Sequence, residues 1–157
     1  MILLLIFLLF INSVMTSDNW DKFFFHTSIS CDFDHKPSFT YDIMFYESDT
    51  LIVGGFDDAI TNNFEDQPLL PEGIVNRTYP GQMNGDEYFG STYEPYAYIT
   101  HDCLLTEEPV TVSIIMYYAT QKCRFGKGDC HIYVNIDLTG LEGDEKREVR
   151  VEQGATH

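Results

Sequence analysis

Basic residues are scarce in this sequence of 157 residues. Nine Lys and Arg residues stand against 25 Asp and Glu residues, which gives a formal net charge of −16 at pH 7. Nucleic acids and anionic membranes repel a chain of this charge, so we exclude nucleic acid as a partner. The acidic surface has two interpretations: it keeps the protein soluble, or it attracts cations such as Ca²⁺ or a basic partner.

Metal-binding and catalytic motifs are also missing. The five histidines lack the short spacings of zinc sites, and no D-x-D-x-D-G calcium loop occurs. Neither a G-x-S-x-G elbow nor a glycine-rich phosphate loop is present. One acidic group is either a weak Ca²⁺ site or a solvated loop: Asp57, Asp58, Glu65 and Asp66. We predict no cofactor and no metal.

No apolar run is long enough to cross a bilayer, which requires about 20 apolar residues. The longest run, residues 2–11, is followed by small and polar residues. This pattern predicts a signal peptide over residues 1–17, with an uncleaved anchor as the alternative, and a secreted, extracellular mature protein. Asn76-Arg77-Thr78 is a glycosylation sequon, which predicts a surface position and a glycan on Asn76.

Cysteine is limited to four residues: Cys31, Cys103, Cys123 and Cys130. An even number in a secreted chain indicates two disulfides, for which three connectivities are possible. The segment CRFGKGDC contains two glycines, which make a tight return easy. A local Cys123–Cys130 pair is therefore favoured, and it leaves Cys31 to pair with Cys103.

Helical periodicity is almost absent, whereas alternation with period two recurs. It predicts strands in FFFHTSIS, SFTYDIMFY, YEPYAYIT, VTVSIIMYYAT and HIYVNIDL, and a hairpin at Asn84-Gly85. We expect residues 57–82 to form a long loop, with a short strand at about residues 73–79. The pattern predicts one all-β sandwich domain over residues 18–141 and a frayed, charged tail over residues 142–157.

Several motifs follow one another in an order shared with a known family. They are a first strand ending in Cys31, then FTYDIMFYESD, MNGDEYFG, EPYAYITHDC and NIDLTGLEGDEKRE. Together they resemble the nematode transthyretin-like family of secreted proteins, whose Pro-containing strand also ends in His-Asp-Cys. The resemblance spans residues 29–148. It implies a transthyretin-like (prealbumin) β-sandwich of about seven antiparallel-rich strands with Greek-key connections.

The chain departs from that family at its cysteines. Pro109-Val110 and Val149 stand where the family commonly has two further cysteines. The remaining two family cysteines match Cys31 and Cys103, so the resemblance also implies that these two pair. Cys123 and Cys130 are an addition that we interpret as a stapled hairpin loop.

The triplet His101-Asp102-Cys103 combines residue types found in nucleophilic sites. Neighbours on a strand point to opposite faces, so the three side chains cannot converge. A disulfide-bonded Cys103 also has no thiolate. We therefore expect the triplet to close a strand, with Asp102 bonding to backbone N–H groups and His101 packing on an aromatic neighbour.

Two groups of residues are candidates for binding. The segment QKCRFGKGDC gathers basic and aromatic residues at the loop closed by Cys123 and Cys130: Lys122, Arg124, Phe125 and Lys127. They suit a phosphate headgroup or an acidic protein surface; the alternative is an ordinary surface hairpin. Tyr93, Tyr96 and Tyr98 either fill the sandwich or line a recognition face, and we expect the core to hold at least half of them.

These observations favour a secreted, non-catalytic binding protein. Its partner would be an extracellular receptor, a lipid headgroup or a small apolar ligand. The alternatives are a hydrolase related to the transthyretin-fold enzymes and a structural or host-interaction protein. One branch of that fold hydrolyses 5-hydroxyisourate with a basic and histidine constellation and a Tyr-Arg-Gly-Ser ending. This chain ends in GATH, so we do not transfer that activity.

Overall fold

The computed structural model describes residues 20–33, 38–48, 57–62, 64–66, 74–83, 92–106, 108–117, 123–124 and 126–154. Within these ranges the chain forms ten strands and no helix, so the described part contains no helix able to span a membrane. The predicted signal peptide and the Asn84-Gly85 hairpin lie outside the described residues.

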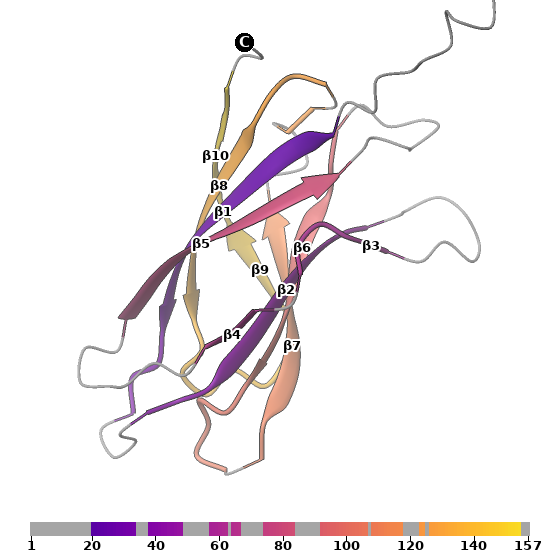
Figure 1. Ribbon diagram of the computed structural model, residues 1–157. Coiled ribbons are helices and arrows are strands. Elements are labelled where there is room, and N and C mark those ends of the chain that lie inside the picture. Colours follow the sequence, from indigo (N-terminus) through magenta and orange to yellow (C-terminus); the bar gives the residue numbers. More distant parts are fainter. Residues whose placement is uncertain are drawn as a thin grey trace, which may run out of the picture.

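The strands divide into two mixed sheets (Figure 1). The four-stranded sheet contains β5 (Ile74–Met83), β1 (Asp21–Ser30), β8 (Cys130–Asp137) and β10 (Arg150–Gln153), in that order. The six-stranded sheet contains β3 (Asp58–Ala59), β2 (Tyr41–Glu47), β6 (Pro95–His101), β7 (Val110–Tyr117) and β9 (Glu145–Glu148). Its sixth strand, β4 (Phe64–Asp66), also pairs with β2.

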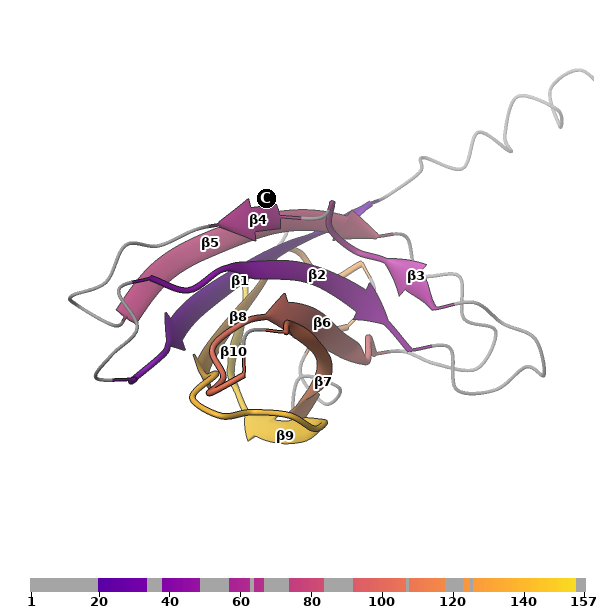
Figure 2. The same ribbon diagram turned by 90° about the horizontal axis from the view of Figure 1, so that it is seen from below.

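Most strand pairs are antiparallel, and two are parallel: β1 with β8, and β7 with β9. Seen from below, the six-stranded sheet curves, and its last strand β9 comes round toward β8 and β10 of the other sheet (Figure 2). At the opposite edge, the Gln82 N–H donates to the Ile60 carbonyl oxygen at 3.0 Å. This architecture confirms the prediction of an all-β sandwich.

The core follows from the alternation of apolar residues along the strands. Phe23, Phe25 and Ile29 of β1 are fully buried, and so are Ile43 and Phe45 of β2. The predicted inward faces of β7 and β8 are also buried, with Val112, Ile114, Met116, Ile132, Val134, Ile136 and Leu138. Phe25 and Phe45 stack across the interface between the sheets, with ring centroids 3.9 Å apart.

Two segments are more ordered than the sequence predicted. The long loop expected over residues 57–82 contains β3 and β4, and the short strand expected at about residues 73–79 is the longer strand β5, Ile74–Met83. The segment expected to be a frayed tail contains β9, which pairs with β7, and β10, which pairs with β8. Val149 and Val151 anchor this segment, because both are buried in the core. The chain therefore crosses from one sheet to the other at Val149.

Candidate binding site

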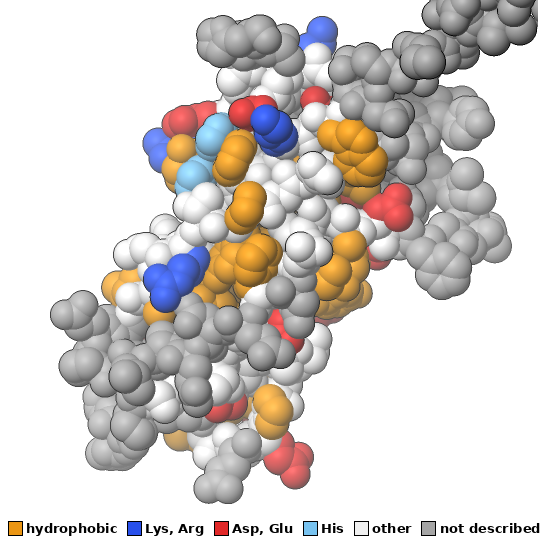
Figure 3. Space-filling view, in the orientation of Figure 1, with side chains coloured by type: hydrophobic (Ala, Val, Ile, Leu, Met, Phe, Trp, Pro, Cys, Tyr) orange, Lys and Arg blue, Asp and Glu red, His pale blue; other side chains and the backbone are white. Residues whose placement is uncertain are grey.

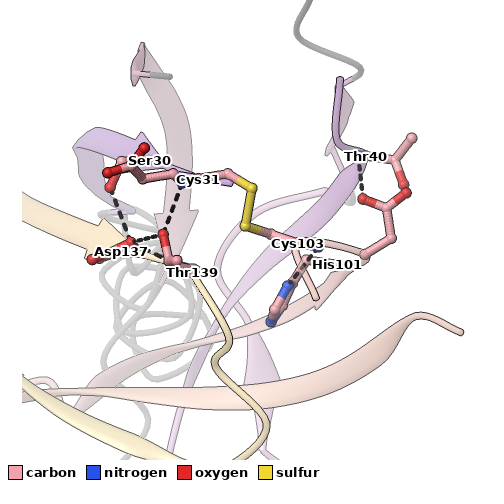
Figure 4. Close-up of a disulfide and its surroundings, with 9 residues drawn as sticks. Ser30, Cys31, Thr40, His101, Cys103, Asp137 and Thr139 are labelled. Carbon is pink, nitrogen blue, oxygen red and sulfur yellow. Dashed lines mark hydrogen bonds between the residues drawn. A yellow bond between two sulfur atoms is a disulfide. The ribbon is translucent and has the colours of Figure 1, made fainter. Parts of the chain in front are cut away.

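The His101-Asp102-Cys103 triplet closes the end of β6 (Figure 4). Cys103 forms a disulfide with Cys31, which ties the end of β1 to the end of β6 and so joins the two sheets. Asp102 Oδ1 accepts the Thr40 N–H at 2.8 Å, and His101 Nδ1 accepts the Cys103 N–H at 3.2 Å. The triplet has a structural role, because Cys103 is in a disulfide and the side chains of Asp102 and His101 both accept hydrogen bonds from backbone N–H groups.

A second set of hydrogen bonds supports the same end of the sandwich. An oxygen of Asp137 accepts the hydroxyl of Thr139 at 2.6 Å, the N–H of Thr139 at 3.0 Å and the hydroxyl of Ser30 at 3.3 Å. Thr139 Oγ1 in turn accepts the Asp32 N–H at 2.8 Å. The bond from the Thr139 hydroxyl is the main reason why the pKa of Asp137 lies below its ordinary value.

The predicted basic loop is closed by a disulfide between Cys123 and Cys130. Arg124 and Lys127 are exposed, and Lys122 and Phe125 lie outside the described residues. The loop is anchored on both sides: buried Asp21 accepts the Gly126 N–H at 2.7 Å, and the Gln153 amide donates to the Arg124 carbonyl oxygen at 2.9 Å. Gly126 has a φ of 63°, which suits a residue without Cβ.

The acidic candidates for Ca²⁺ belong to two segments that pair with different parts of β2, β3 with Tyr46–Glu47 and β4 with Tyr41–Ile43. Asp57 and Asp58 are exposed near β3, and Glu65 and Asp66 lie in β4. Among the described residues, no group of three or more His, Cys, Asp or Glu side chains is placed to hold a metal ion. Asp57 instead accepts a hydrogen bond from the hydroxyl of Tyr96 at 2.5 Å.

The outer face of the six-stranded sheet carries a cluster of tyrosines. Register places Tyr46 of β2 opposite Tyr96 of β6, and Tyr96 opposite Ile115 of β7. Tyr98 lies one step along β6 on the same face, and its ring is perpendicular to that of Tyr96, at an angle of 89° and a centroid distance of 5.2 Å. Tyr93 differs from both, because it is buried in the core and donates to Asp21 at 2.8 Å.

A small open depression of about 270 Å³ lies over this cluster, and we call it the tyrosine hollow. Its lining includes Asp57, Glu94, Tyr96, Tyr98, Ser113 and Ile115. Tyr98 and Ile115 are 43 % and 40 % exposed, so an apolar ring and an apolar side chain are accessible beside two carboxylates. β9 pairs with β7 on the side away from β6, and Lys146 of β9 lies opposite Ile115 in register.

Tyr96 lines the hollow and is held in place by burial and by its hydrogen bond to Asp57. Its side chain is 8 % exposed, and burial, followed by the hydrogen bond to Asp57, raises the pKa of its hydroxyl far above the ordinary value. The hydroxyl therefore stays a donor to Asp57 over the physiological pH range. This bond holds the Asp57 carboxylate at the hollow, where its charge faces any entering ligand.

The outer face of the four-stranded sheet brings together residues that the sequence did not connect. Two histidines lie side by side among apolar, basic and acidic side chains (Figure 3). Each side chain of this group contacts the next. Arg150 lies 4.0 Å from the centroid of the Tyr133 ring, and the Tyr133 ring stacks on the His26 ring at 4.5 Å. The His26 ring stacks on that of His131 at 5.3 Å, and the His131 ring stacks on that of Phe24 at 4.8 Å. We call this stack the histidine face.

Hydrogen bonds fix the central ring of the histidine face. His26 Nδ1 lies 2.9 Å from Thr78 Oγ1, and His26 Nε2 lies 3.0 Å from His131 Nδ1. Burial is the main reason why the pKa of His26 is lowered from 6.5, and His131 and Arg150 lower it further against an opposing effect of Glu152. His26 is therefore mostly neutral at pH 7.

The alternation in FFFHTSIS and HIYVN predicts which residues of these two strands face outward, and those residues include the members of the histidine face on β1 and β8. Spacing along the chain gave no pairing for His26 and His131, because the contact depends on the parallel register of β1 with β8.

The comparisons with family models, with curated proteins and with solved structures find no match to this chain.

Proposed function

We propose that this protein is a secreted, non-catalytic binding protein with a transthyretin-like sandwich, whose tyrosine hollow binds an arginine side chain of a basic extracellular partner. Two disulfides and an all-β sandwich are compatible with the oxidising space outside cells. The Cys31–Cys103 pairing supports the transthyretin-like assignment, because the resemblance implies the same pair.

The observation that carries this proposal is the accessible ring of Tyr98 beside the carboxylates of Asp57 and Glu94. A guanidinium group stacks on aromatic faces and pairs with carboxylates through two parallel hydrogen bonds. The tyrosine hollow offers both features within about 270 Å³, which suits one side-chain head group better than a large ligand. A neutral apolar ligand would bring no positive charge to the two carboxylates.

The charge of the whole chain supports the same partner. A net charge of −16 attracts a basic protein over long range and raises its association rate. Long-range attraction does not by itself select a site. Selection comes from the hollow, where a cation contacts a ring and an acid at once.

The test is titration of the protein with an octa-arginine peptide, with octalysine as the comparison probe, at physiological salt. We expect octa-arginine to bind more tightly, because lysine does not form the planar, two-bonded contact. Tyr98→Ala should weaken octa-arginine binding about 3- to 10-fold through loss of the cation–π contact. Asp57→Asn should weaken it at least as much.

The matched control is Asp58→Asn. It makes the same charge change one residue along the chain, at an exposed position that is not among the residues lining the hollow. Equal losses for Asp57→Asn and Asp58→Asn would show that the peptide senses net charge alone, and the proposed site would then be wrong. Unchanged binding by Tyr98→Ala would contradict it as well.

One observation favours a second function, the hydrolase. Thr78 Oγ1, His26 and His131 form a chain of hydrogen bonds of 2.9 and 3.0 Å, which has the order of nucleophile, base and orienting group. In the required tautomer, His26 Nδ1 takes the Thr78 proton as Oγ1 attacks an ester carbonyl. His26 Nε2–H meanwhile donates to His131, and His26 then gives the Thr78 proton to the leaving alcohol as its C–O bond breaks. Water, deprotonated by His26, attacks the resulting ester of Thr78, releases the acid and restores the hydroxyl.

Hydrolysis of p-nitrophenyl acetate tests this second function. Activity that Thr78→Val and His26→Gln abolish and Thr78→Ser preserves would favour the hydrolase. Thr100→Val is the matched control, because Thr100 pairs with Thr111 at 2.8 Å on the other sheet. A rate equal in the wild type and in Thr78→Val would exclude Thr78 as the nucleophile.

A further inference from the structure

The glycosylation sequon lies within a strand of the four-stranded sheet. Asn76 and Thr78 belong to β5, and register places them opposite Ser28 and His26 of β1. Both are exposed, and both line an open depression of about 770 Å³ on the outer face of the sheet. A group attached to Asn76 would therefore start at the rim of this depression.

We propose that this depression holds the N-linked glycan of Asn76, and that the first sugars of the glycan lie across the sheet against Asn135, Tyr133 and Arg150. The inference requires passage through the secretory pathway and so rests on the proposed secretion. It is independent of the tyrosine hollow on the other sheet.

Register shows how the sugars would run. Asn76, Ser28 and Asn135 form one row across β5, β1 and β8, and Thr78, His26, Tyr133 and Arg150 form the next row. Neighbouring strands lie about 4.8 Å apart, so only the width of β1 separates Asn76 from the residues of β8. The first two sugar rings of a glycan span this width.

The chemistry of the depression suits a carbohydrate. Ring stacking covers the faces of Tyr133 and His26, and Thr78 and His131 engage both nitrogens of His26. Tyr133 therefore offers its ring edge and hydroxyl oxygen to a ligand. Ser28, Asn135 and Arg150 add a hydroxyl, an amide and a guanidinium to the same lining. Sugar hydroxyls both donate and accept hydrogen bonds, and this set of side chains provides partners of both kinds.

A glycan here would also protect the edge of the sheet. β5 is the last strand in its order, is ten residues long and exposes Ile74 at 57 %. Long edge strands are templates for pairing with other chains, and proteins often shield them.

The experiment uses the full chain secreted from eukaryotic cells. Intact mass is measured before and after peptide N-glycosidase F, together with the mature N-terminus. We expect one glycan, lost in Asn76→Gln. Removal of the glycan should lower Tm by about 2–4 °C. The enzyme converts Asn76 to an aspartate, so the unglycosylated Asn76→Asp variant controls for the new charge.

Substitutions inside and outside the depression test where the glycan lies. Asn135→Ala should reduce the glycan-dependent Tm shift, and the exposed-face change Ser113→Ala on the other sheet should leave it intact. Independently, deglycosylation should move the ring proton resonances of Tyr133 and leave those of Tyr98 unchanged. A secreted protein with unmodified Asn76, or a glycan that shows neither effect, overturns the inference and leaves the proposed function standing. A protein that is not secreted contradicts both.

Discussion

The two outer faces of the sandwich both carry aromatic side chains, but they use them differently. On the four-stranded sheet, the rings stack on one another and on Arg150, and His26 engages both of its nitrogens with Thr78 and His131. On the six-stranded sheet, the ring of Tyr98 stays accessible beside Asp57 and Glu94. The contacts of Tyr98 with Tyr46 and Tyr96 are perpendicular, at 71° and 89°, whereas the rings of the histidine face stack on one another. Aromatic residues on a sheet therefore serve packing or binding according to how their neighbours meet them.

The largest expected loss of stability comes from removing the disulfide that joins the two sheets. Replacing Cys31 and Cys103 by serine should lower the free energy of unfolding by about 4 kcal/mol, because their loop spans 72 residues. Removing Cys123–Cys130, with a separation of 7 residues, should cost about 2–3 kcal/mol. Chemical denaturation of the two double variants measures both values. Equal losses would contradict the expectation that the disulfide closing the longer loop stabilises the fold more.

Two alanine variants, one on each face, compare how far each tyrosine contributes to stability and to binding. Tyr133→Ala should cost about 1–2 kcal/mol of stability, because it removes contacts with His26 and Arg150. Tyr98→Ala should cost less than this, since its ring is 43 % exposed, but it should reduce octa-arginine binding. Thermal unfolding and titration, run on both variants, separate the two roles. If Tyr133→Ala reduced the binding equally, the faces would not differ as we argue.

The basic loop offers a third surface. If Arg124 and Lys127 dock on anionic headgroups, replacing both by glutamate should reduce binding to phosphatidylserine vesicles by at least about tenfold, because each basic residue contributes about 1 kcal/mol there. Vesicle sedimentation measures the effect, and neutral phosphatidylcholine vesicles are the control. Unchanged binding by the double variant would rule out a headgroup site at this loop.

The smallest expected effect is a pH dependence of the histidine face. The pKa of His26 is lowered in the folded state, so the unfolded chain takes up the proton first as the pH falls through 6.5. Stability should therefore be unaffected by His26 above about pH 7 and should decline toward pH 5. Thermal unfolding at pH 7.5 and 5.0 tests this against His26→Gln, which should lose less stability on acidification. The same decline in both proteins would assign it to other groups.

Much of the fold was predictable, because it depends on alternation within single strands. The inward faces of β1, β2, β7 and β8 were each visible as apolar residues two apart, and the cysteine pairs followed from spacing and resemblance. The end of the chain was not predictable in this way. β9 and β10 are short and charged, and they form because Val149 and Val151 bury their side chains between strands from distant parts of the chain.

The sequence by itself determined the acidic charge, which depends on composition alone. It also determined the strand periodicity, the local Cys123–Cys130 pair and the position of the sequon, because each of these depends on residues close together in the chain. Tertiary structure alone decided which outward side chains meet. Tyr96 donates to Asp57, and His26 contacts His131, only because strands far apart in the sequence lie side by side. Register, a property of two strands, sets these contacts, so a pattern within one strand does not contain them.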